Sequence, residues 1–212
     1  MKVDMESFKS VKDFAETVKA EVPILDLLVL NAGIAAIDFQ LTPDGYERIT
    51  QVNYLSNALL LLELLPLLKA TAIKTGSPSR VTWLGSRRHY KSSLESTKPL
   101  APDSTVLGHF NDKDNFFAIL RYGDSKLLCT MFMYELAERV DRKYVVINQL
   151  CPGMTHTGMG NFLVLPLRVL FHIIHGLLAR SVEQAGWIVI NALVVAGPES
   201  HGEFLLDKDI QP

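Results

Sequence analysis

Three short, mostly apolar runs, separated by long helical patterns, set the strongest limit on how this chain can fold. They are residues 25–30, 80–85 and 144–150, and a last run of the same kind stands at 203–206. Near-continuous apolar character over so few residues is typical of strands buried on both faces. Strands that alternate with helices join a parallel sheet through right-handed crossovers. The sequence therefore predicts an α/β fold with a doubly wound, Rossmann-like parallel sheet.

Helical periodicity connects these runs. It predicts helices over about 10–22, 44–70, 116–140 and 182–196. Residues 87–115 are polar and are expected to be irregular. A chain of 212 residues is short for two domains with separate cores, so residues 1–212 are expected to form a single domain.

Charge and cysteine content exclude several classes of protein. Lys and Arg number 21 against 23 Asp and Glu, which favours neither nucleic acid nor an anionic membrane as a partner. Two cysteines, Cys129 and Cys151, provide neither a disulfide framework nor a metal site of paired cysteines. The first residues lack the apolar core of a secretory signal, so we expect a cytoplasmic protein.

The most apolar segment of the chain runs from Phe162 to Leu178. A spanning helix needs about 20 apolar residues with few charges, and this segment is shorter and contains Pro166 and Arg168. We therefore expect no spanning segment here. The segment is interpreted as a lid or substrate-facing helix, with shallow membrane contact as the alternative.

Tyr122 and Lys126 form the sharpest chemical signal. Residues four apart on a helix point the same way, and a nearby ammonium favours the phenolate form of a tyrosine. Such a pair can act as a general acid and base. It also arises by chance on helix surfaces, so its context decides its meaning.

That context resembles the short-chain dehydrogenases/reductases, in particular a retinol-dehydrogenase-like branch found in fungi. The similarity runs from Val3 to the end of the chain. Its motifs stand in the family's order: Asn31-Ala32-Gly33 after a strand, Asn53 in a helix, Leu84-Gly85-Ser86 at a strand end, Tyr122 with Lys126, and Pro152-Gly153-Met154-Thr155-His156-Thr157.

The resemblance implies two sets of site residues. The catalytic set would be Ser86, Tyr122, Lys126 and Asn53, in which Tyr122 exchanges the proton, Ser86 binds the substrate oxygen and Asn53 holds a water molecule. The set that would contact NADP or NAD is Asp4, Asn31, Tyr122, Lys126 and Thr157. Read without the resemblance, Asn31 could cap a strand end, Ser86 could fill a turn and Thr157 could cap a helix.

Two features depart from the family's pattern. Ser86 and Tyr122 are 36 positions apart, so the residues between them, including Phe110–Phe117, are expected to shape substrate specificity. No glycine-rich turn precedes residues 25–30, which predicts a partial sheet that lacks its first strands and the pyrophosphate cradle. About 60 to 90 residues would be absent. Binding of NAD or NADP would then be at least about a hundredfold weaker than with that half, and residues 25–30 would form an exposed apolar edge.

Three hypotheses of function follow. The first is an NAD(P)-dependent oxidoreductase that reduces a ketone or aldehyde, or oxidises a secondary alcohol, on an apolar small molecule, plausibly in fungal secondary metabolism. The second is a cofactor-independent isomerase, dehydratase or cyclase that uses Tyr122, Lys126 and Ser86. The third is a non-catalytic protein that pairs with a relative. The resemblance also implies a homodimer through helices 52–70 and 122–139.

Overall fold

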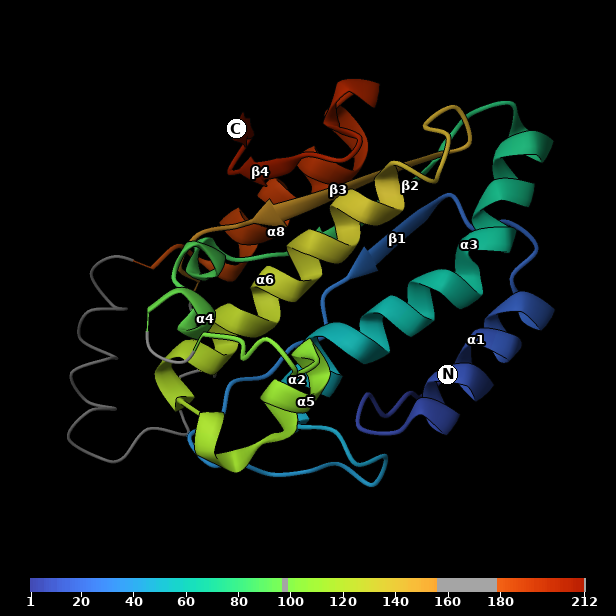
Figure 1. Cartoon of the computed structure of the whole chain (residues 1–212). Coiled ribbons are helices and arrows are strands. Elements are labelled where there is room, and N and C mark those ends of the chain that lie inside the picture. Colours follow the sequence, from blue (N-terminus) through green and yellow to red (C-terminus); the bar gives the residue numbers. More distant parts are fainter. Residues whose placement is uncertain (97–98, 156–178, 212) are drawn as a thin grey trace.

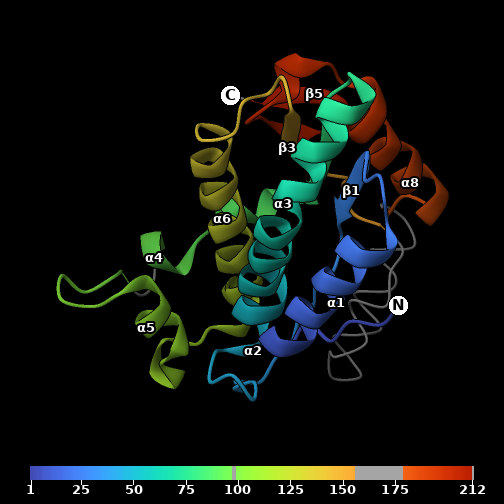
Figure 2. The ribbon, with the colours of Figure 1, turned by 90° about the vertical axis from the view of Figure 1, so that its right-hand side faces the viewer.

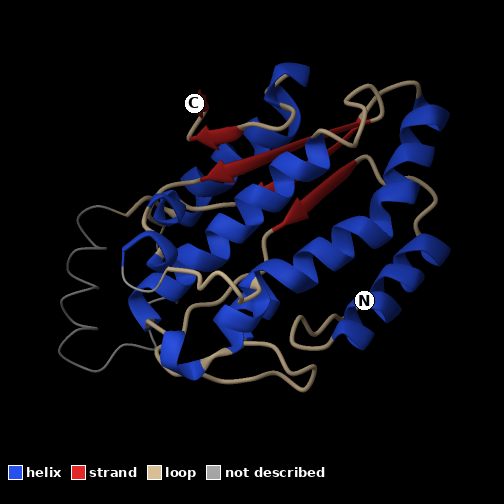
Figure 3. Cartoon of the chain, viewed as in Figure 1, coloured by secondary structure: helices blue, strands red, loops and turns tan. Residues whose placement is uncertain are grey.

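A computed structural model describes residues 1–96, 99–155 and 179–211 of the chain. Within these residues the strands form one sheet in the order β1-β2-β3-β4-β5, in which the first four are parallel and β5 is antiparallel to β4 (Figure 3). The strands are β1 (Leu27–Leu30), β2 (Ser79–Leu84), β3 (Val145–Cys151), β4 (Phe204–Leu206) and β5 (Asp209–Gln211). The predicted α/β fold with a parallel sheet is confirmed.

Helices cover both faces of this sheet. The long helices α1 (Phe8–Glu21), α3 (Ser56–Thr75) and α6 (Ala118–Ala137) lie on one face, and α8 (Val182–Ile190) lies on the other (Figures 1 and 2). The short α2 (Arg48–Thr50) and a π-helical stretch, η1 (Gln51–Leu55), run directly into α3, and a second π-helical stretch, η5 (Asn191–Val195), continues α8. The arrangement is a doubly wound sheet.

The larger core lies under α1, α3 and α6. Val81, Trp83 and Ile147 point from the sheet into it and meet residues such as Leu64 and Met133. The opposite face holds a smaller cluster of Leu150, Ala192 and Leu205. On that face Leu27 is 46% exposed and Val29 is 37% exposed, and within the described residues β1 pairs only with β2. An exposed apolar edge is therefore present at β1, as the sequence predicted.

The predicted helix over 44–70 begins and ends later than expected. Asp44 does not start it, because the Asp44 carboxylate accepts hydrogen bonds from the Phe8 backbone N–H and from Gln51, both at 2.7 Å. Glu47 caps the helix instead by accepting from the backbone N–H groups of Ile49 and Thr50. The helix continues to Thr75 and ends at Gly76, whose left-handed φ of 74° suits glycine.

The region expected to be irregular contains several short helices. They are η2 (Arg87–Tyr90), α4 (Ser93–Ser96), α5 (Val106–Asn111) and η3 (Lys113–Asn115). Their starts follow local caps, since Thr105 accepts from the Gly108 N–H and Asp112 from the Asp114 N–H. Helices of three to six residues leave little periodicity in a sequence, which is why they were not predicted.

The continuous helical stretch Arg48–Thr75 is, within the described residues, long and apolar enough to cross a membrane by length and composition. Half of its most apolar window is buried in the protein, as a core helix would be. The segment interpreted from sequence as a lid, 162–178, lies outside the described residues.

Candidate functional site

Lys126 links the end of β2 to the helix that carries Tyr122. Its side chain is almost fully buried, and its Nζ donates a 2.7 Å hydrogen bond to the backbone oxygen of Leu84. Leu84 ends β2 and precedes Gly85 and Ser86. The same Nζ lies 5.7 Å from the centre of the Tyr122 ring, one turn earlier on α6. The ammonium group therefore lies between the end of β2 and the predicted proton donor.

Gly85 lets the chain leave β2 toward Ser86. A Cβ at Gly85 would lie 2.8 Å from the Gln149 side chain, so any other residue would displace the neighbouring strand's side chain. Ser86 is half-buried, and its Oγ accepts a hydrogen bond from the Arg88 N–H at 3.2 Å. Ser86 thus fills a turn, yet its own O–H stays free of that bond and can donate to another oxygen.

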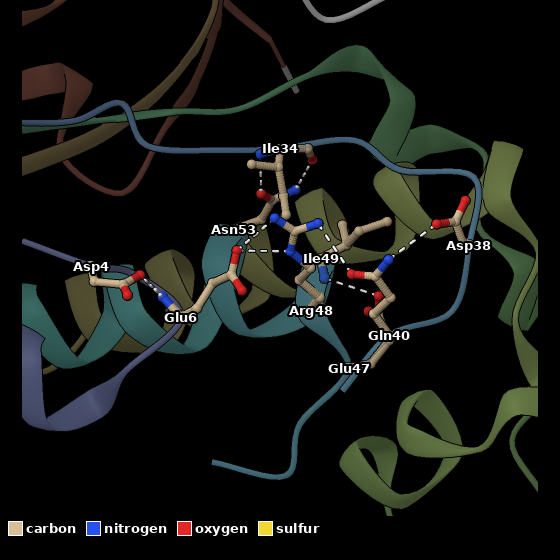
Figure 4. A network of polar contacts seen from close by, with 9 residues as sticks. All are labelled: Asp4, Glu6, Ile34, Asp38, Gln40, Glu47, Arg48, Ile49 and Asn53. Atoms are coloured by element: carbon tan, nitrogen blue, oxygen red, sulfur yellow. Dashed lines mark hydrogen bonds and ion pairs between the residues drawn. The ribbon is translucent and has the colours of Figure 1, made fainter. Parts of the chain in front are cut away.

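Asn53 sits in the π-helical stretch η1, and π-helical turns of this kind are frequent at functional sites. Its Oδ1 accepts from the Ile34 N–H at 2.7 Å, and its Nδ2 donates to the Ile34 oxygen at 3.0 Å (Figure 4). The same Nδ2 donates to Ser125 Oγ at 2.9 Å. Both amide hydrogens are therefore engaged, and only Oδ1 retains capacity to accept from a water molecule.

The segment after β1 is held by its backbone. Asn57 Nδ2 donates to the Ala32 oxygen at 3.1 Å, and Asn53 holds Ile34 on the far side of Gly33. A Cβ at Gly33 would lie 3.6 Å from Lys126 Nζ, which places this segment beside the ammonium group. The Asn31 side chain is left exposed at the end of β1. Sequence reasoning missed Asn57, although it stands four residues after Asn53 on the same helix.

The predicted cofactor contact Asp4 takes part in a different network of hydrogen bonds. Asp4 is exposed, and its carboxylate accepts from the Glu6 N–H at 2.9 Å. Glu6 in turn pairs with Arg48 at 2.7 Å, as the network in Figure 4 shows. Among the described residues Asp4 makes no hydrogen bond or ion pair with Tyr122 or Lys126. Thr157 lies outside the described residues.

The residues around Tyr122 fix α6 to the chain that follows β2. Asp124 is buried and accepts from Ser92 Oγ at 3.0 Å and from the Ser93 N–H and Oγ, both at 2.7 Å. Ser125 Oγ donates to the backbone oxygen of Tyr122 at 2.8 Å while it accepts from Asn53 Nδ2. These contacts orient the helix about its axis and leave the Tyr122 side chain half-buried at the site.

Gly123 permits the closest approach between α6 and η2. A Cβ there would lie 2.6 Å from the Arg88 backbone oxygen and 2.9 Å from that of Lys91. We expect Gly123→Ala to lower the free energy of unfolding by about 1–3 kcal/mol, because backbone atoms cannot give way cheaply. Chemical denaturation measures this. The matched control is Gly186→Ala on α8, where a Cβ meets nothing within 4 Å, and which should be neutral or stabilise by up to about 1 kcal/mol. Equal effects of the two variants would contradict the close approach.

Cys129 lies on the inner side of the same helix. Burial raises the pKa of its thiol to about 12, so the thiol stays protonated at neutral pH. It donates to the backbone oxygens of Asn53 at 3.3 Å and Ser125 at 3.1 Å. Its role is therefore packing rather than nucleophilic chemistry. In the described part of the chain no three His, Cys, Asp or Glu side chains cluster so that they could hold a metal ion.

The chain is similar in sequence to known short chain dehydrogenases. Residues 1–91 match the model of the short chain dehydrogenase family. The chain is 53% identical over 210 residues to "Short chain dehydrogenase yanD" of Aspergillus niger and 50% identical to "Short-chain dehydrogenase/reductase tropG" of Talaromyces stipitatus. In both cases 99% of this chain is covered, and the chain spans 64% of the length of these curated relatives.

Solved structures share the fold at lower identity. A 3-oxoacyl-[acyl-carrier protein] reductase from Brucella melitensis in complex with NAD matches with a TM-score of 0.70 and 18% identity, over 98% of this chain and 75% of that one. The RhlG/NADP active-site complex of Pseudomonas aeruginosa matches with a TM-score of 0.67 and 21% identity, over 97% and 73%. At such identities the likeness concerns the fold.

Proposed function

Because this chain belongs to the short-chain dehydrogenase/reductase family, we propose that it acts in an oxidoreductase that interconverts a carbonyl and an alcohol on an apolar small molecule. The observation that carries the proposal is the position of Lys126. One buried ammonium group contacts the strand end that leads to Ser86 and lies beside the Tyr122 ring. Tyrosine, lysine and serine at one sheet edge suit proton transfer to and from an oxygen atom.

A nicotinamide cofactor, NADP or NAD, would supply or accept the hydride in this chemistry. The described residues fit its nicotinamide side. Lys126 carries three N–H donors, and its Nζ lies 3.6 Å from the position of a Cβ on Gly33, at the carboxyl end of β1 where ligands bind in such sheets. We propose that Lys126, Tyr122 and Asn31 contact the cofactor. Asp4 and Thr157 are proposed on the family resemblance.

The roles of the chain's own residues follow from their hydrogen bonds. In reduction, the Tyr122 hydroxyl donates its proton to the substrate oxygen, and the Lys126 ammonium stabilises the phenolate that remains. Ser86 donates its free O–H to the same substrate oxygen. Asn53 orients Ser125 and Ile34, and its Oδ1 can accept from a water molecule. Lys126 would pass a proton to the Tyr122 phenolate, and this water would replace the proton on Lys126, which restores both groups.

The proposal also includes a homodimer and a cytoplasmic location. Apolar side chains stand exposed on α3 and α6, among them Leu62 (46%), Met131 (52%) and Tyr134 (42%). They support a homodimer through helices 52–70 and 122–139. A cytoplasmic location and a role in fungal secondary metabolism are proposed on the resemblance to the fungal relatives.

The experiment separates cofactor binding from proton chemistry. The 212-residue chain is titrated with NADPH, with NADH and with reduced nicotinamide mononucleotide, which carries only the nicotinamide side. Binding is followed by nicotinamide fluorescence. Oxidation of the reduced cofactor is then measured in the presence of each of several apolar ketones. We expect saturable binding of the mononucleotide that Lys126→Met weakens at least about tenfold, because a charge-assisted hydrogen bond is lost. Arg139→Met, an exposed change after the same helix, is the control.

The possible results have distinct meanings. Hydride transfer to a ketone supports the oxidoreductase. Isomerisation or dehydration of a substrate without any cofactor would replace it with the proton-transfer alternative. Absence of both binding and turnover would refute the proposed function for this chain.

A further inference from the structure

Arg121, the residue before Tyr122, is a fully buried cation. Its guanidinium carbon lies 4.4 Å from the centre of the Phe110 ring and 5.5 Å from that of Phe116. Its Nη2 donates to the backbone oxygen of Asn115 at 2.8 Å. Nε and Nη1 have no hydrogen-bond partner among the described residues. Burial lowers the pKa of Arg121, while the charges of Glu47 and Asp124 raise it.

Burying a guanidinium group with so few hydrogen bonds is costly, so stability alone does not account for an arginine at this position. Within the described part of the chain, the hydrogen bond and both ring contacts of the Arg121 side chain fall in one segment, Phe110–Phe116. An arginine that stacks on two aromatic rings and holds a backbone oxygen fixes a loop more sharply than an apolar residue would. The loop in question lies between Ser86 and Tyr122 in the sequence.

The same segment is tied to the helix that carries Asn53. Asn111 Oδ1 accepts from the Glu47 N–H at 2.8 Å, and Asn111 Nδ2 donates to the Gly45 oxygen at 3.1 Å. The Phe116 ring packs edge-on against Phe39, 5.7 Å between centres. Phe39 follows the Asn31–Gly33 segment. The Phe110–Phe116 segment therefore bridges α6, the start of α2 and the chain after β1.

We propose that Arg121 is a positioning residue that locks the Phe110–Phe116 segment against α6 and thereby sets the substrate selectivity of the site at Tyr122. The effect on selectivity rests on the proposed oxidoreductase function, whereas the locking of the segment does not. Arg121 and Tyr122 are neighbours on one helix, α6. By holding the Phe110–Phe116 segment, Arg121 therefore fixes the position of that segment relative to Tyr122.

The first measurement needs no substrate. Hydrogen exchange of the backbone amides is compared in the wild type, in Arg121→Met and in Arg121→Lys. Methionine fills the space between the rings without charge, and lysine keeps the charge but loses the planar fork. We expect amides 110–117 to exchange at least about tenfold faster in both variants, since one charge-assisted hydrogen bond is lost. Amides 145–151 of β3 should change less than about twofold, because the apolar replacement of a buried ion is well tolerated.

Two further variants are measured: Arg139→Met as a control and Phe116→Leu as a second test of the contact. Arg139 is exposed and its side chain pairs with Glu135, so its removal should leave exchange at 110–117 unchanged. Phe116→Leu removes one ring from the stack and leaves the charge in place. It should accelerate the same amides, and it keeps the test decisive if Arg121→Met folds poorly.

The second measurement uses ketones of different width. In Arg121→Met we expect KM for the preferred ketone to rise about tenfold with kcat within about twofold, and discrimination between ketones to fall by a similar factor. A purely structural role would instead lower kcat through the folded fraction and leave KM and discrimination unchanged. That result would overturn the proposal, and so would unchanged or uniformly faster exchange. If the wild type shows no turnover, the oxidoreductase proposal fails while the exchange experiment still decides the role of Arg121.

Discussion

Tyr122→Phe should lower turnover of a carbonyl substrate about a thousandfold, within the range of a lost general acid. Only the hydroxyl oxygen is removed, so the half-buried ring keeps its place on α6. Lys126 keeps its hydrogen bond to the Leu84 oxygen, so the cluster at the end of β2 should remain intact. Steady-state kinetics with saturating reduced cofactor measures the loss, and the circular dichroism spectrum and melting temperature should match those of the wild type.

Tyr134→Phe provides the matched control. Tyr134 lies on the same helix, three turns further on, and 42% of its surface is exposed. Removing its hydroxyl should change kcat/KM less than about twofold. If Tyr122→Phe retained more than about a tenth of the wild-type kcat, another group would be the proton donor, and the reading of Tyr122 and Lys126 as an acid and base would be wrong.

The parts of the fold that could be predicted are those that depend on burial alone. β2 and β3 are buried on both faces, so nearly every residue in them is apolar or pairs with a neighbour, and the expected bounds differ from the observed ones by one residue. The start of the 48–75 helix could not be predicted as well. Asp44 looks like a helix cap in sequence, but its carboxylate accepts from the backbone N–H of Phe8 at the start of α1, 36 residues away. A local pattern cannot reveal a long-range acceptor.

The candidate site divides in the same way. The pairing of Tyr122 with Lys126 follows from helical spacing, and the proximity of Leu84–Ser86 follows from the expected sheet edge. Asn53 hydrogen-bonds to Ile34 and to Ser125, and neither partner could be predicted. These bonds depend on the π-helical stretch η1 and on contacts between a side chain and another segment of the chain. Arg121 was missed because a charged residue beside a tyrosine reads as a surface residue until its burial is known.

The six residues from Arg121 to Lys126 therefore hold more than the proposed acid and base. Five of them anchor α6 to a different neighbour: Arg121 to Asn115, Gly123 to η2, Asp124 to Ser93, Ser125 to Asn53 and Lys126 to Leu84. Tyr122 itself is half-buried, and its ring centre lies 5.7 Å from Lys126 Nζ. A catalytic hydroxyl must be held closely to its working geometry, and these separate anchors supply that restraint.

Asp124→Ala should give the largest loss of stability among these anchors, about 3 kcal/mol. The carboxylate is buried and accepts three hydrogen bonds, two of them from Ser93. Alanine leaves the buried Ser93 N–H and Oγ without this acceptor, and unsatisfied buried groups carry the full cost of desolvation. For a chain of this length the melting temperature should fall by about 6–12 °C. Asp114→Ala, at an exposed position in η3, should shift stability by less than about 0.5 kcal/mol.

A double-mutant cycle with Ser93→Ala tests whether these hydrogen bonds are the cause. Ser93→Ala removes the hydroxyl donor and leaves the backbone N–H in place, so the two positions share one bond of 2.7 Å. If that bond carries energy, the double variant should be more stable than the sum of the single losses predicts, by about 1 kcal/mol or more. Strict additivity would mean that the bond from Ser93 Oγ carries no net energy. Asp124 would then stabilise α6 through its bonds to the Ser93 N–H and Ser92 Oγ, through packing or through its charge near Arg121.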